Sequence, residues 1–203
     1  MGAAMKRRFF MMAAPMALAS CASEAVWAPD ELVQRNIYRH NGPPRLTLFT
    51  VLNVGSNNGA HSGLMVNGSQ RVIFDPAGTF AHPTIPERND VVIGARPRIV
   101  DYYTDYHARE TYYIVVQEVD VSAAVAEQAL QMVMTNGPVA KANCTRSIST
   151  ILAQLPGFES IGVSWFPGGL MEDFARIPNV RAREIFDNDS DNNVGVLDKI
   201  QNG

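Results

Sequence analysis

The stretch RLTLFTVLNV, residues Arg45 to Val54, is the segment of the chain that most clearly predicts a β-strand. The stretch is rich in β-branched and aromatic residues on both faces of the expected strand. A strand with two apolar faces is covered on both sides. The segment therefore predicts a central strand of a sheet, around which the rest of the chain is arranged.

The following segments predict an α+β fold. AHSGLMV (60–66) and RVIFD (71–75) flank Asn67-Gly68-Ser69 and predict a hairpin. Further strands are expected at 110–120 and 180–186, and helices at 122–134, 144–155 and 169–177, the first with Ser122 as its cap. The proline-containing segment 76–98 is expected to form a long ordered loop, and 24–44 to cross the surface. Strands and helices do not alternate regularly, which favours α+β over α/β.

The N-terminal residues have the layout of a secretory signal. Lys6, Arg7 and Arg8 precede an apolar run that ends at Leu18, and this run is shorter than the roughly 20 residues needed to span a bilayer. The tetrapeptide Leu18-Ala19-Ser20-Cys21 resembles the lipobox of bacterial lipoproteins. That resemblance implies cleavage before Cys21, lipid on its thiol, and a chain anchored to a membrane in the bacterial cell envelope, on its periplasmic or outer-membrane face. The alternative is an ordinary cleaved signal in which Cys21 is incidental.

The charge composition of the chain limits the kinds of partner that it is expected to bind. The full chain has a formal net charge of −3, and removal of residues 1–20 takes away three basic and no acidic residues. The remaining mature chain is acidic and has no cluster of Lys and Arg, so it is not expected to bind nucleic acid. The sequence divides into a signal peptide (1–20), a tether and N-terminal segment (21–44), one domain (45–186) and an acidic tail (187–203).

Cys144 is one of two cysteines in the chain. If Cys21 carries lipid, Cys144 has no disulfide partner; an unmodified Cys21 would leave a Cys21–Cys144 disulfide open. Asn143 is a favourable N-cap, so Cys144 would begin a helix, where the helix dipole stabilises a thiolate. The thiol also shares a helix face with apolar residues, and local sequence alone leaves a reactive and a core cysteine equally open: Ile148, Ile151, Leu152, Leu155.

A reactive thiol needs a base, and His61 begins a predicted strand whereas the other three histidines lie in or beside loop-like segments. A two-residue turn would pair His61 with Phe74 and put Asp75 on the opposite face. A three-residue loop, Val66 to Gly68, would pair His61 with Ile73 and leave Asp75 on the same face as His61. The second register is preferred because it also gathers the apolar residues on one face.

The pieces HSGLMV, VIFDPAG and NCTRSISTIL, in this order, resemble the circularly permuted branch of the papain-like NlpC-type thiol hydrolases. That branch includes the YiiX/YaeF-like envelope proteins and the lecithin–retinol acyltransferase group. The resemblance implies a papain-like antiparallel sheet packed against helices over residues 45–186. It assigns Cys144 as the nucleophile, His61 as the general base and acid, and Asp75 as the residue that orients the imidazole.

The chemistry implied by this resemblance is acyl transfer through a thioester, on an amide or ester of a cell-wall peptide or a lipid, without a metal or organic cofactor. The competing interpretation is a lipid-anchored, non-catalytic module that uses the same fold for binding or scaffolding.

Two patterns in the sequence bear on metal binding. DNDSDNNVGVLD, Asp187 to Asp198, has oxygen ligands at several positions of an EF-hand-like loop, but Asn192 replaces the expected Gly and Asp198 the expected Glu. A solvated acidic tail is favoured over a calcium site. The histidines show no paired spacing typical of zinc ligands, so no zinc site is expected from the sequence.

Overall fold

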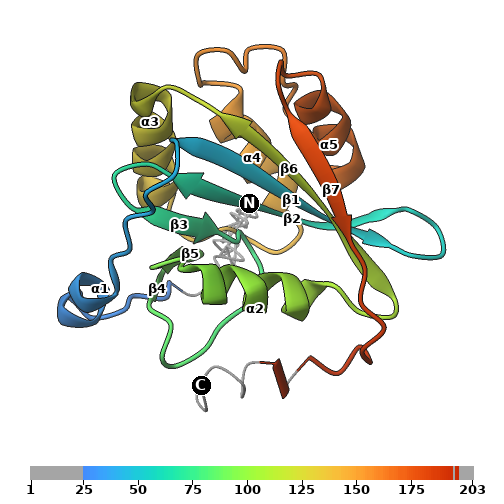
Figure 1. Ribbon diagram of the computed structural model, residues 1–203, viewed down its shortest axis with the longest axis horizontal. Coiled ribbons are helices and arrows are strands. Elements are labelled where there is room, and N and C mark those ends of the chain that lie inside the picture. The colour runs from blue at the N-terminus through green and yellow to red at the C-terminus, as the bar shows by residue number, and fades with distance from the viewer. Residues whose placement is uncertain (1–24, 194, 197–203) are drawn as a thin grey trace, which may run out of the picture.

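The computed structural model describes residues 25–193 and 195–196, and in these the protein has an α+β fold. A seven-stranded sheet has the order β4-β5-β3-β2-β1-β6-β7, with every neighbouring pair antiparallel (Figure 1). The strands are β1 Arg45–Asn53, β2 Gly59–Asn67, β3 Arg71–Phe74, β4 Glu87–Arg88, β5 Val91–Ile93, β6 Tyr112–Asp120 and β7 Arg181–Ile185. The helices are α1 Asp30–Asn36, α2 Pro97–His107, α3 Ala123–Thr135, α4 Cys144–Leu152 and α5 Pro167–Ala175.

The predicted central strand is confirmed as β1, which pairs with β2 on one side and β6 on the other. Its two faces belong to different cores. Leu46 and Leu48 pack with residues of α3, α4 and α5, whereas Phe49 and Val51 pack with residues of α2 on the opposite face. One face of the sheet is therefore the three-helix side and the other is the α2 side.

Neither predicted hairpin register is correct. The β2–β3 loop is Gly68-Ser69-Gln70, so that Asn67 pairs with Arg71 and Leu64 with Phe74. Asn67 extends the strand because its side-chain amide donates to the Pro43 carbonyl at 2.7 Å, which removes it from the turn. The observed register differs from the preferred one, but it keeps the same side chains on the same face of the sheet. His61 and Asp75 therefore do share a face, the one covered by α2.

The sequence predicts a long ordered loop over residues 76–98, but the structure shows that this segment also contains regular secondary structure. It contains β4 and β5, and β5 adds to the sheet beside β3. The segment also holds the start of α2, whose first residue is Pro97, and the helix places His107 in its last turn rather than in a loop. Strands of two and three residues separated by an Asn-Asp turn are too short to produce a clear periodic pattern.

The helix at Cys144 begins where predicted but differs in detail. It ends at Leu152, before Pro156, and the Asn143 side chain donates to the Lys141 carbonyl instead of capping the helix. The Ser122 cap of α3 is confirmed, since its hydroxyl accepts from the backbone N–H of Val125 at 3.2 Å.

Residues 25–44 pack onto the domain. Trp27 forms an isolated bridge with Arg88, and Val33 of α1 enters the core on the three-helix side. Cys21 and the remainder of residues 1–24 lie outside the described residues, so the predicted signal and lipidation site stay predictions. In the described part of the chain, no helix is both long and apolar enough to cross a bilayer.

The described part of the acidic tail is mostly exposed and also makes polar contacts with the domain. The backbone N–H of Glu110 donates to the Asp189 carbonyl at 2.9 Å, and Arg109 forms an ion pair with the Asp189 carboxylate. Asp191 accepts hydrogen bonds from Thr111. Asp198, the last position of the EF-hand-like pattern, lies outside the described residues.

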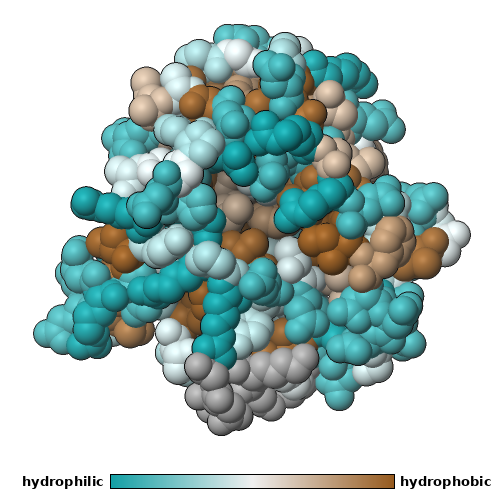
Figure 2. All heavy atoms as spheres, viewed as in Figure 1, coloured by the Kyte–Doolittle hydropathy of each residue, from teal (hydrophilic) through white to brown (hydrophobic). Residues whose placement is uncertain are grey.

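The edge strand β7 is largely exposed and carries charged side chains, a composition that disfavours pairing with another sheet. On the face of the molecule in Figure 2, hydrophobic areas are separated from one another by hydrophilic side chains.

We predict that Ile148→Ala lowers the free energy of unfolding by about 2–5 kcal/mol, because Ile148 is fully buried between α4 and the sheet and its loss leaves a cavity. Urea denaturation followed by circular dichroism measures the change. Thr150→Ala, on the exposed side of the same helix, is the matched control and should change stability by no more than about 0.5 kcal/mol. Equal effects of the two changes would contradict the assigned helix face.

Candidate active site

The candidate site forms beside β2, at the end of this strand that the shorter β3 does not reach. The last pair between β2 and β3 is Leu64 with Phe74, whereas β2 begins five residues earlier, at Gly59, and is paired there with β1. The edge of β2 from Gly59 to Gly63 is therefore not covered by β3. The first turn of α4 lies against this edge, where the Thr145 and Ser62 hydroxyls are 3.1 Å apart.

Cys144 is a free cysteine with 8% of its surface exposed. Its sulfur lies 3.8 Å from the Thr145 hydroxyl, and the Ser62 backbone N–H and the His61 side chain lie near enough to affect its ionisation. Burial raises the pKa of the Cys144 thiol, but the interactions with His61 and with the Ser62 and Thr145 donors outweigh it and bring the pKa down to about 7. A substantial fraction of the thiol is therefore ionised at neutral pH.

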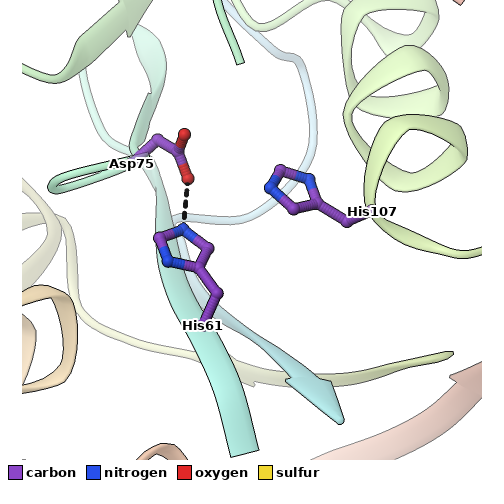
Figure 3. A group of neighbouring side chains, drawn as sticks. All are labelled: His61, Asp75 and His107. Carbon is purple, nitrogen blue, oxygen red and sulfur yellow. Dashed lines mark hydrogen bonds and ion pairs between the residues drawn. The ribbon is translucent and has the colours of Figure 1, made fainter. Parts of the chain in front are cut away.

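His61 connects this thiol to a buried carboxylate. Its Nε2 lies 2.7 Å from Oδ1 of Asp75, which is 4% exposed (Figure 3). Burial lowers the pKa of His61, but the attraction and hydrogen bond of Asp75 prevail and raise it to about 10. Burial likewise raises the pKa of Asp75, and His61 more than offsets this, so that the pKa of the carboxyl falls to about 2. Because Nε2 is engaged with Asp75, Nδ1 is the ring nitrogen left for Cys144.

Tyr103 of α2 holds the same carboxylate. Its hydroxyl donates to Asp75 Oδ1 at 2.7 Å, and the ring is completely buried. Gly63 leaves the space that the Tyr103 hydroxyl occupies, because a Cβ at position 63 would overlap this hydroxyl. Gly78 is required in a similar way, since a Cβ there would overlap the Asp75 carboxylate.

His107, one turn after Tyr103, lies beside His61. The ring centroids are 5.5 Å apart with an interplanar angle of 6°, and Figure 3 shows the His107 ring pointing toward His61 and Asp75. Its Nδ1 lies 2.8 Å from the Tyr103 carbonyl, an acceptor, so Nδ1 carries the proton. Burial lowers the pKa of His107 to about 4, and the ring is neutral at pH 7.

The structure brings the three predicted residues, Cys144, His61 and Asp75, into one cluster. Sequence reasoning missed Tyr103 and His107 because it missed α2; the pattern that could have revealed them is a tyrosine and a histidine four residues apart on one helix face. The other two histidines serve local turns, since His40 accepts from the Gly42 N–H and His82 interacts with Thr84.

Two cavities flank the cluster. One, of about 270 Å³, is lined by Asp75, Gly78 and Lys141 among others, and the other, of about 230 Å³, by Ala60 and His107 among others. A larger cavity of about 450 Å³ lies away from Cys144, between Trp27 and Pro86. Of these three cavities, the two smaller ones are lined by a residue of the cluster, Asp75 in the first and His107 in the second.

Comparison with known proteins found no matching family model, no matching curated protein and no matching solved structure. The chemistry of the site is therefore argued from its own geometry.

We predict that Cys144 reacts with iodoacetamide with a half-maximal rate near pH 7, because thiolate forms as pH rises through the lowered pKa. In His61→Ala the midpoint should move above the ordinary thiol value of about 8.5, since burial then acts without the attraction of the imidazolium. Mass spectrometry of the alkylated protein measures the rates. His40→Ala is the matched histidine control, and a midpoint that moved equally in both variants would refute the Cys144–His61 interaction.

We predict that Gly63→Ala destabilises the protein by roughly 1–3 kcal/mol, because the added methyl group overlaps the Tyr103 hydroxyl. Tyr103→Phe removes that hydroxyl, so the double variant should recover part of the loss. Thermal unfolding of the four proteins gives the coupling energy. Strict additivity would show that Gly63 is not required by Tyr103.

Proposed function

We propose that the protein is a cysteine hydrolase or acyltransferase that cleaves an amide or ester through a thioester on Cys144. The observations that support this most directly are the 2.7 Å contact between His61 Nε2 and Asp75 Oδ1 and the lowering of the pKa of the Cys144 thiol by the neighbouring His61. A nucleophile, a base and a group that orients the base are the parts that acyl transfer by a thiol needs. A scaffold module needs none of them.

In the proposed reaction the Cys144 thiolate attacks the substrate carbonyl carbon, and the carbonyl π electrons move to oxygen. His61 gives its Nδ1 proton to the leaving amine or alcohol as the bond from carbon to the leaving group breaks, which leaves a thioester. His61 then takes a proton from water or another acceptor, which attacks the thioester and releases the acyl group. Asp75 keeps its charge throughout and fixes the ring orientation.

The developing oxyanion needs donors near the thiol. The backbone N–H of Cys144 is the first candidate, because it is the first residue of α4 and the initial N–H groups of a helix have no partner within the helix. The positive end of the α4 dipole favours the same negative charge.

The assignment to the permuted papain-like fold and the location at the cell envelope are part of this proposal as well. The antiparallel sheet, with a histidine strand early and a cysteine helix late in the chain, is what the permuted papain-like arrangement requires. With lipid on Cys21, the enzyme would act at the bacterial cell envelope on cell-wall peptides or lipids. The first described residue is Ala25, so the expected anchor would stand a few residues from the domain.

We predict that p-nitrophenyl acetate acylates the full chain at Cys144, as measured by intact-protein mass spectrometry and by release of p-nitrophenol. Cys144→Ala should abolish the adduct. His61→Ala should slow acylation at pH 7 by about 10²–10⁴-fold, the usual range for loss of a general base. Asp75→Asn should also slow it, because the ring loses its orienting charge.

Thr150→Ala serves as the control for this experiment, since it alters α4 on the side away from the site. Acylation that survives Cys144→Ala, or a rate unchanged by His61→Ala, would refute the catalytic proposal and favour the binding module.

A further inference from the structure

A second arrangement of ligand atoms overlaps the candidate active site. One ligand atom each from His61, Asp75 and His107 lies within 4.8 Å of the other two. The residues come from β2, the segment after β3 and the end of α2, so their spacing in the sequence resembles no zinc motif. For this reason the sequence alone predicts no zinc site.

The donor set suits zinc. Zinc in proteins is bound by His nitrogen and by carboxylate oxygen at about 2.0–2.2 Å, which places the ligands of a tetrahedral site about 3.4 Å apart. The three ligand atoms already lie within 4.8 Å of one another, and His61 Nε2 and Asp75 Oδ1 would have to move apart from their 2.7 Å contact to reach that separation. Two histidines and one carboxylate are also a known set of protein ligands in zinc sites that keep a fourth position for water.

His107 is already arranged as a ligand. Its Nδ1–H donates to the Tyr103 carbonyl, which leaves Nε2 with its lone pair. In zinc proteins, a metal-bound histidine generally makes this kind of hydrogen bond through its other nitrogen. Figure 3 shows that a nitrogen of the ring faces the space in front of His61 and Asp75.

The second ligand, Asp75, is held in the same way by the Tyr103 hydroxyl. One residue of α2 therefore supports two of the three ligands, through its carbonyl and through its side chain. His107, the third ligand, also lines the cavity of about 230 Å³.

We propose that His61, Asp75 and His107 form a binding site for Zn²⁺, with His61 Nε2, an Asp75 oxygen and His107 Nε2 as the ligands and water in the fourth position. Binding requires that His61 release its Nε2 proton, so metal and the His61–Asp75 hydrogen bond exclude each other. Binding itself does not depend on the proposed acyl-transfer chemistry.

The consequence for catalysis does rest on the proposed function. With zinc at Nε2, His61 keeps its remaining proton on Nδ1, because losing it would leave an imidazolate. The ring then no longer passes a proton to a leaving group, and Zn²⁺ inhibits acylation.

Equilibrium dialysis of the purified full chain against Zn²⁺, and the visible absorption of the Co²⁺-substituted protein, test the site. We expect one ion per chain, bound at least tenfold more weakly in His107→Gln and about equally in wild type, Cys144→Ala and His82→Gln. The Co²⁺ spectrum should lack thiolate charge-transfer bands. Binding lost in Cys144→Ala, or unchanged in His107→Gln, would overturn the assignment.

Should His107→Gln fail to fold, NMR of the wild-type protein gives the answer. Zn²⁺ should shift the ring resonances of His61 and His107 and leave those of His40 and His82 in place; shifts confined to the latter two would overturn the site. Because Cys144→Ala cannot form an acyl-enzyme but keeps all three ligands, failure of the zinc site and failure of the proposed function give different results.

Discussion

The buried charge of Asp75 is the constraint on which the arrangement of the site depends. A carboxylate that is 4% exposed is stable in its ionised form only if it accepts strong hydrogen bonds or has an opposite charge nearby. Asp75 has both, from the Tyr103 hydroxyl and the His61 ring. Because these two partners come from α2 and β2, this single group connects the end of β3 to the helix on one face of the sheet and to the neighbouring strand.

Three consecutive residues of β2 serve this arrangement in different ways. His61 supplies the ring on the α2 face, and Gly63 leaves room there for the Tyr103 hydroxyl. Ser62 faces the other side, where its hydroxyl meets Thr145, while its backbone N–H interacts with the Cys144 sulfur along the uncovered strand edge. The early end of β3 makes this possible, because a paired β3 would have taken that N–H into the sheet.

The sequence predicts the features of the fold and the site that depend on local patterns. It does not predict those that depend on tertiary contacts between distant segments. The apolar faces of β1, the Ser122 cap and the start of α4 at Cys144 follow from residue types and spacing. The hairpin register does not, because it depends on the contact of Asn67 with Pro43. Helix α2 was missed because its buried residues are few, mainly Tyr103 and Tyr106, and no side chain caps its start. Tyr103 and His107 could therefore not be connected to Asp75 from the sequence.

The two interpretations of Cys144, core residue or reactive thiol, do not exclude each other in this structure. Ile148, Ile151 and Leu152 bury the same face of α4 and hold the helix against the sheet. Burial of the thiol alone would raise its pKa, yet the helix start places it beside His61 and the donors of Ser62 and Thr145, which lower it. The apolar contacts thus fix the position of the thiol, and in the proposed reaction a thiol held in one place loses little entropy on approaching the substrate. The hydrophobic pattern that suggested an inert cysteine is thus also what holds the thiol in the position that the proposed reaction requires.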